Sequence, residues 1–143
     1  MKLHKSLSLA VSLPAAAVVV LGVAPQAQAD AGTGCSNYST NCGIFYYNTG
    51  FQGSRTAFRW DSVPDLAGYK FLTSGAGQGL YVKNNAASFY NSSDKLATIF
   101  YNSNYGGACD TVAAWADAYQ LRNTYNENAS LGFGKSGYNC YKF

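Results

Sequence analysis

The segment Phe45-Tyr46-Tyr47-Asn48-Thr49-Gly50-Phe51-Gln52-Gly53 recurs, 54 positions further on (47 to 101), as Ile99-Phe100-Tyr101-Asn102-Ser103-Asn104-Tyr105-Gly106-Gly107. In both copies aromatic residues are followed by Asn, Ser, Thr and Gly, as at the turn of a β-hairpin. A second pair of motifs follows at a spacing of 42 (84 to 126): Asn84-Asn85-Ala86-Ala87-Ser88 and Asn126-Glu127-Asn128-Ala129-Ser130. Two elements repeated in the same order predict one structural unit that is duplicated within a domain.

The first 29 residues have the pattern of a secretory signal peptide. Lys2, His4 and Lys5 precede an apolar run from residue 7 to residue 23, and Ala27-Gln28-Ala29 supplies a small-x-small cleavage site before Asp30. A membrane anchor is the alternative, which the basic start and the cleavage site disfavour. We therefore expect a secreted, extracellular protein whose residues 30–41 form a loose N-terminal arm.

The composition after residue 29 excludes several classes of function. Two of the 10 Lys and Arg residues lie in the leader, which leaves 8 against 7 acidic residues, a net charge of about +1. No nucleic-acid or membrane partner is expected from this charge. The only His is His4, so His-dependent catalysis and His-ligated zinc are excluded. The carboxylates that could act in pairs are Asp61 with Asp65 and Asp110 with Asp117, but Asp is also a common turn residue, and we expect no enzyme.

Four cysteines, Cys35, Cys42, Cys109 and Cys140, follow the leader. An even count in a secreted chain predicts two disulfides, for which three pairings exist. We favour Cys35–Cys42, near the new N-terminus, and Cys109–Cys140, which would join the C-terminal tail to the second repeat. A four-cysteine zinc site is the alternative, which the absence of a C-x-x-C disfavours.

Short apolar and aromatic runs between turn residues predict an all-β sandwich or barrel. The chain between Asp61 and Gly68 is predicted as a connecting arch, and the Ala-rich stretch from Val112 to Leu121 has weak helical character. Strands are expected at residues 43–47, 54–59, 69–72, 80–83, 88–90, 97–101, 107–112 and 131–133.

An aromatic hairpin followed by an Asn-Asn-x-x-Ser arch resembles the βγ-crystallin Greek key, two of which make one domain. The first half resembles more specifically peptidase inhibitor family 36, the microbial metalloproteinase inhibitors. The stretches that carry this resemblance are 42–47, 51–56, 63–66 and 84–91. The resemblance implies an all-β, βγ-crystallin-like inhibitor domain over residues 42–143, a β-sandwich of two Greek-key motifs with repeats at about 42–91 and 96–133.

The same resemblance implies a monomeric inhibitor that binds an extracellular protease of the thermolysin type stoichiometrically. Inhibitors of this family are thought to present a rigid, disulfide-braced loop. Here the matching stretch has no Cys, so the reactive bond cannot be transferred. The candidate inhibitory loop is Asn91, Ser92, Ser93, Asp94, Lys95 and Leu96, with Lys95–Leu96 as the hypothetical reactive bond. A solvated hairpin loop is the alternative interpretation of this stretch.

The resemblance also implies that calcium is possible, although no cofactor is required. The candidate ligands are Asn84, Asn85 and Ser88 in one arch, and Asn126 and Ser130 in the other. These ligands are mostly neutral, and calcium affinity follows ligand charge, so we expect weak binding. Two alternative functions follow: a calcium-binding structural or cell-surface module of the βγ-crystallin type, and a small secreted toxin on the same fold.

Overall fold

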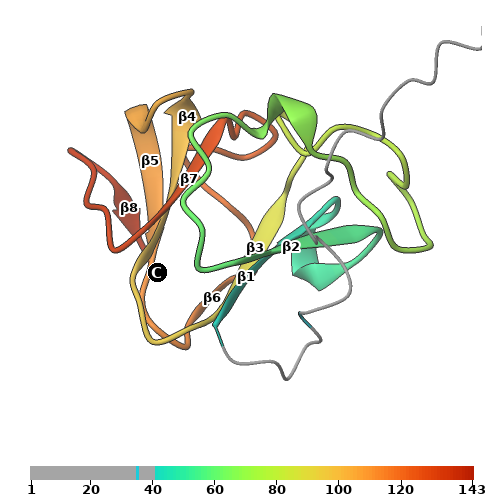
Figure 1. Cartoon of the computed structure of the whole chain (residues 1–143), viewed down its shortest axis with the longest axis horizontal. Helices are drawn as coiled ribbons and strands as arrows, with labels where there is room; N and C mark the ends of the chain where they lie inside the picture. The colour runs from blue at the N-terminus through green and yellow to red at the C-terminus, as the bar shows by residue number, and fades with distance from the viewer. Residues whose placement is uncertain (1–34, 36–40) are drawn as a thin grey trace, which may run out of the picture.

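The computed structural model describes Cys35 and residues 41–143, and these residues form two four-stranded sheets that pack face to face (Figure 1). The predicted signal peptide and most of the predicted arm lie outside the described residues. The first sheet has the strand order β2-β1-β3-β6, and the second has the order β7-β4-β5-β8. The elements are β1 (Cys42–Tyr46), η1 (Thr49–Phe51), β2 (Arg55–Arg59), η2 (Leu66–Gly68), β3 (Ser88–Ser92), β4 (Ala97–Asn102), β5 (Gly106–Val112), β6 (Asp117–Ala118), β7 (Ser130–Phe133) and β8 (Tyr141–Lys142).

The two repeats are interlocked, because each contributes a short segment to the sheet of the other. From the second repeat, β6 pairs with β3 in the first sheet. From the first repeat, Val63 forms a bridge with Leu131 of β7 in the second sheet. This reciprocal exchange gives two Greek keys, and it confirms the predicted all-β, two-motif sandwich.

The hydrophobic core lies between the sheets and is largely aromatic. Phe45 and Phe89 are fully buried and meet edge to face with ring centroids 4.8 Å apart. Gly43 lies against the rings of Phe89 and Phe133, where a Cβ atom would come within 2.6 Å and 2.8 Å of them. The small residue before the first aromatic pair is therefore required by the packing of the core.

Both predicted disulfides are present. Cys35–Cys42 closes a seven-residue separation beside the outer face of β1. Cys109–Cys140 joins β5 to the C-terminal segment, whose strand β8 pairs in parallel with β5. The cysteines are thus structural, and no free cysteine occurs among the described residues.

The predicted hairpin strands are confirmed to within one or two residues, but two predictions were wrong. The Ala-rich stretch after Val112 is not helical, because a turn at Trp115 leads into β6, which pairs with β3. Ala has the highest helix propensity, but intrinsic propensity is a weak preference, and pairing with the open edge of β3 outweighs it. Strands were also predicted at residues 69–72 and 80–83, where only an isolated bridge joins Lys70 and Tyr81. The three intervening glycines with positive φ bend the chain away from an extended ladder.

The predicted arch at residues 61–68 is irregular apart from η2, and the Asp65 carboxylate accepts a hydrogen bond from the Ala67 N–H at the start of that turn. Within residues 41–143, no helix is both long and apolar enough to cross a bilayer.

Candidate functional site

The candidate inhibitory loop, residues 91–96, connects β3 of the first sheet to β4 of the second (Figure 1). Its first three residues, Asn91, Ser92 and Ser93, are buried. Asp94 and Lys95 are exposed and form what we call the loop tip. The loop is therefore not a uniformly solvated turn, because a buried base supports a two-residue tip.

The side chain of Asn91 organises this base. Its Nδ2 donates to the carbonyl oxygens of Lys95 at 2.8 Å, Val112 at 3.1 Å and Ala113 at 2.8 Å. One amide group thus joins the far end of the loop to the chain that leaves β5. Because Asn91 is fully buried, water competes little for these hydrogen bonds.

Ser93 completes the network. Its hydroxyl lies 2.6 Å from Asn91 Oδ1 and 3.1 Å from the Lys95 carbonyl oxygen. Its own carbonyl accepts a hydrogen bond from the Trp115 N–H at 3.1 Å. The network fixes both ends of the loop without a covalent bond.

The tip contacts a further side chain on the surface. The Lys95 ammonium lies 4.7 Å from the centre of the Trp60 ring, in a cation–π arrangement. The neighbouring Asp94 is also exposed, so the tip presents one anionic and one cationic group side by side.

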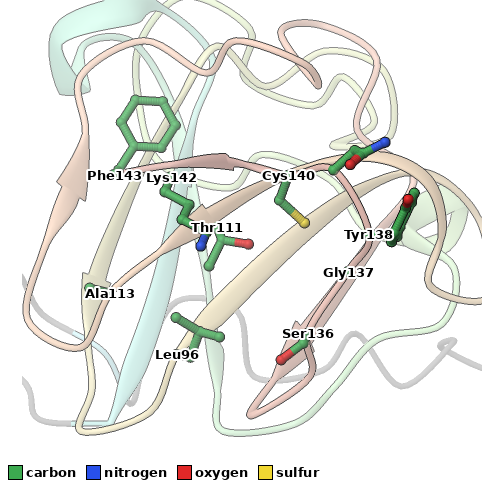
Figure 2. Close-up of a pocket in the computed structure, with 10 residues that line it drawn as sticks. Leu96, Thr111, Ala113, Ser136, Gly137, Tyr138, Cys140, Lys142 and Phe143 are labelled. Carbon is green, nitrogen blue, oxygen red and sulfur yellow. The ribbon is translucent and has the colours of Figure 1, made fainter.

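Leu96 lies at the edge of a cleft of 620 Å³ between β5 and the C-terminal segment. Figure 2 shows Leu96 on one side of this cleft and Cys140 and Lys142 on the other. The lining also includes Phe143, whose N–H donates to the Thr111 carbonyl. The predicted reactive bond therefore borders a concave surface.

The two Asn arches have the same structural role in each repeat. Ser88 Oγ donates to the Asn48 carbonyl at 2.6 Å and accepts from the Phe51 N–H at 3.1 Å. In the second repeat, Ser130 Oγ makes the equivalent pair of bonds with Asn102 and Tyr105, at 2.7 and 3.1 Å. Each arch thus fastens its own aromatic hairpin.

The Asn residues of the arches shape and join the backbone. Asn84 and Asn126 adopt left-handed conformations with φ of 61° and 53°. Asn85 Nδ2 donates to the Tyr81 and Lys83 carbonyls. Asn128, which was not among the predicted site residues, accepts from the Ala86 N–H at 3.0 Å and so links the two arches.

A polar hollow of 430 Å³ brings together two of the predicted calcium ligands, Asn84 and Asn126, with Glu127 and Lys83. The Glu127 carboxylate beside Tyr101 raises the pKa of that phenol above its ordinary value. No cluster of three or more His, Cys, Asp or Glu side chains suited to a metal occurs among the residues that the structure describes. The hollow offers one carboxylate and neutral amide oxygens.

Asp110 and Asp117, one of the two pairs of carboxylates predicted as candidates for catalysis, lie on strands of different sheets, β5 and β6. Asp110 is fully buried and accepts hydrogen bonds from the backbone N–H groups of Arg122, Asn123 and Thr124, and from the Thr124 hydroxyl at 2.6 Å. Asp117 is exposed on β6. Asp110 therefore holds a loop in place.

The sequence predicted a candidate inhibitory loop at residues 91–96, but not the hydrogen-bonded base that supports it. An Asn at the end of a strand has the same appearance in sequence whether its amide faces solvent or a buried network. In the neighbouring sequence, only the two serines that follow Asn91 hinted at a hydrogen-bonded network.

Comparison with solved structures supports the fold. A chain solved in work on the evolution of the eye lens βγ-crystallin domain fold superposes with a TM-score of 0.58 at 16% identity, covering 72% of this chain and 95% of that one. A βγ-crystallin from Ciona intestinalis gives 0.51 at 14% identity, covering 64% and 98%. The N-terminal domain of Protein S gives 0.50 at 21% identity, covering 64% and 93%. At such identities the likeness shows the βγ-crystallin fold.

A search of curated proteins found no significant match. A family model, described as peptidase inhibitor family I36, matches residues 30–112, which is more than half of the chain. Members of an inhibitor family act by binding, which agrees with the prediction that this protein is not an enzyme. The protein therefore belongs to peptidase inhibitor family I36.

Proposed function

We infer that this protein is a secreted, monomeric inhibitor that binds an extracellular metalloprotease of the thermolysin type stoichiometrically through residues 91–96. Membership in the inhibitor family supports a protease as the partner, and two disulfides fit an extracellular protein. The observation that carries the proposal for this loop is the exposed tip on a buried, hydrogen-bonded base.

The base preorganises the loop for binding. A loop that is already fixed loses little conformational entropy when it enters a protease cleft. The Asn91 amide donates a hydrogen bond to the Lys95 carbonyl oxygen at 2.8 Å, and the Ser93 hydroxyl lies 3.1 Å from the same oxygen. That oxygen belongs to the Lys95–Leu96 bond, so a protease must break these contacts before it can polarise the carbonyl. Tight binding with slow cleavage follows, and this distinguishes an inhibitor from a substrate.

The function is tested by titrating thermolysin with the protein lacking residues 1–29 and following hydrolysis of a fluorogenic peptide. We expect activity to fall linearly and to reach its minimum at one inhibitor per active site. Leu96→Asp should weaken inhibition, since thermolysin-like enzymes prefer a large apolar residue after the cleaved bond. Leu80→Asp is the control, because it makes the same change at an exposed Leu of the glycine-rich segment near the other end of β1, whereas Leu96 is half-buried.

Full inhibition by Leu96→Asp would exclude the Lys95–Leu96 bond as the reactive bond. An absence of inhibition by the wild-type protein at high molar excess would exclude thermolysin-like enzymes as targets.

Weak calcium binding at the polar hollow is a second candidate function. Asn84, Asn126 and Glu127 supply hard oxygen atoms there, whereas the Lys83 ammonium opposes a cation. The Ser88 and Ser130 hydroxyls already donate and accept one hydrogen bond each, so only one lone pair of each remains for a metal. Calorimetry and thermal unfolding at millimolar calcium test this candidate. No heat and no change in melting temperature would exclude it.

A further inference from the structure

Both tryptophans of the chain have a backbone conformation that bulky residues rarely adopt. Trp60 has φ of 54° and Trp115 has φ of 60°, which lies in the left-handed region. In this region the Cβ atom of an L-residue is crowded, so Gly and Asn are the usual occupants. Each tryptophan therefore costs the fold stability that a glycine would not cost.

The local turns account for the positive φ at these two positions, but not for the presence of tryptophan there. Trp60 is the central residue of a tight turn, in which the Asp61 N–H donates to the Arg59 carbonyl at 2.7 Å. Trp115 is the third residue of a turn closed by a bond from the Ala116 N–H to the Ala113 carbonyl. Glycine fits both places better.

Packing in the core does not explain the tryptophans either. Trp60 is 41% exposed and Trp115 is 55% exposed. Large aromatic surface is left in water at two strained positions. Strain of this kind persists where the surrounding structure imposes it and is concentrated at functional sites.

The two tryptophans flank the loop tip. Trp60 follows β2 and Trp115 precedes β6, and these are the outer strands of the sheet β2-β1-β3-β6. The antiparallel pairings place the end of β2, the end of β3 and the start of β6 at the same end of the sheet. The tip follows β3, which lies between these two outer strands, so the strand order places one tryptophan on each side of the tip. Direct contacts agree: Lys95 lies over the Trp60 ring, and the Trp115 N–H donates to Ser93.

We propose that Trp60 and Trp115 are the anchor residues of the inhibitor, and that they bind the two rims of the protease cleft while the tip enters it. This inference rests on the proposed function. A stable protein–protein interface buries about 800 Å² on each partner, far more than two tip residues can supply. Exposed Trp is also the side chain most enriched among residues that dominate binding energy.

The test uses Trp60→Gly and Trp115→Gly in the protein lacking residues 1–29 with both disulfides formed. Inhibition constants for thermolysin are measured together with melting temperatures. Each variant should weaken inhibition at least tenfold, while its melting temperature stays the same or rises by a few degrees because glycine accepts positive φ. Trp115→Phe keeps an aromatic ring and should retain most of the affinity. Leu80→Ala, an exposed apolar residue remote from the tip, should change neither quantity.

The outcomes separate the two proposals. Wild-type inhibition that the glycine variants retain in full overturns the role of the tryptophans and leaves the proposed function standing. Melting temperatures that fall steeply in both variants show a structural role and also overturn the inference. A wild-type protein that does not inhibit overturns the proposed function and this inference with it.

Discussion

Replacing Asn91 with Ala should remove the brace of the candidate inhibitory loop. The substitution deletes the amide that donates to three carbonyl oxygens, of which that of Val112 is buried, and the oxygen that lies 2.6 Å from the Ser93 hydroxyl. Two amide hydrogens and one acceptor correspond to three hydrogen bonds, each worth about 1 kcal/mol net. The Val112 carbonyl oxygen left buried without this donor adds to the cost, so we expect a loss of about 3–5 kcal/mol. A domain of this size should then melt roughly 10–20 °C lower and still fold.

The same substitution should also make the loop cleavable by the protease. Without the amide, the Lys95 carbonyl keeps only its 3.1 Å contact with the Ser93 hydroxyl and can turn more easily toward an attacking protease, so the inhibitor should become a substrate. The assay incubates each protein with a catalytic amount of thermolysin at a temperature where both are folded, and mass spectrometry follows cleavage between residues 91 and 97. We expect the wild type to stay intact and Asn91→Ala to be cut.

Asn85→Ala is the matched control. Its Nδ2 also donates to two backbone carbonyls, at 3.0 and 3.1 Å, but at a partly exposed site. We expect it to cost about 1 kcal/mol or less and to leave the loop resistant. The reasoning is refuted if Asn91→Ala melts no lower than Asn85→Ala, or if its loop is cut no faster than that of the wild type.

Three further predictions concern the scaffold. Asp110→Asn should lose at least about 4 kcal/mol in urea unfolding, because a buried carboxylate that accepts four hydrogen bonds is replaced by a neutral amide; a loss below about 1 kcal/mol would contradict this. Ser88→Ala should cost about 2–3 kcal/mol by freeing a hairpin carbonyl and N–H, and a value near zero would show that water replaces the hydroxyl. The hydrogen bond from the Lys83 ammonium holds the pKa of Asp65 below its ordinary value, so this pair stabilises the fold above about pH 4 and the contribution is lost as acid protonates Asp65. Asp65→Asn should therefore weaken the dependence of stability on pH at the acid side, by less than about 1 kcal/mol in the free energy of unfolding. Melting temperatures measured across that pH range check this, and an unchanged profile would mean that the pair contributes nothing.

The parts of the fold that repeat could be predicted from the sequence. Aromatic residues that alternate with turn residues carry a local signal, so both hairpins and both arches were found. The even cysteine count, with a short spacing near the start, also led to the observed pairing. Strand β6 was not found, because two residues that bind a sheet edge carry no pattern of their own and the Ala-rich context favours helix.

The candidate site was harder to predict, since its features depend on contacts between distant residues. Asn91 reaches carbonyls 21 and 22 positions away, and no local rule connects them. The positive φ of the two tryptophans opposes their residue preference, so sequence reasoning would assign Gly or Asn to such turns. Conflicts between local preference and observed conformation are expected mainly at functional positions.

The pseudo-symmetry of the fold supports the proposal that the joint between the repeats binds the partner. The hairpins and arches repeat, and Ser88 and Ser130 make the same bonds in each half. These elements are therefore explained by stability alone. Residues 91–96 connect one repeat to the next, so this segment occurs once and has no equivalent in the other repeat. A fold that fixes both ends of this segment in separate sheets holds it rigidly, and its sequence remains free to fit a partner.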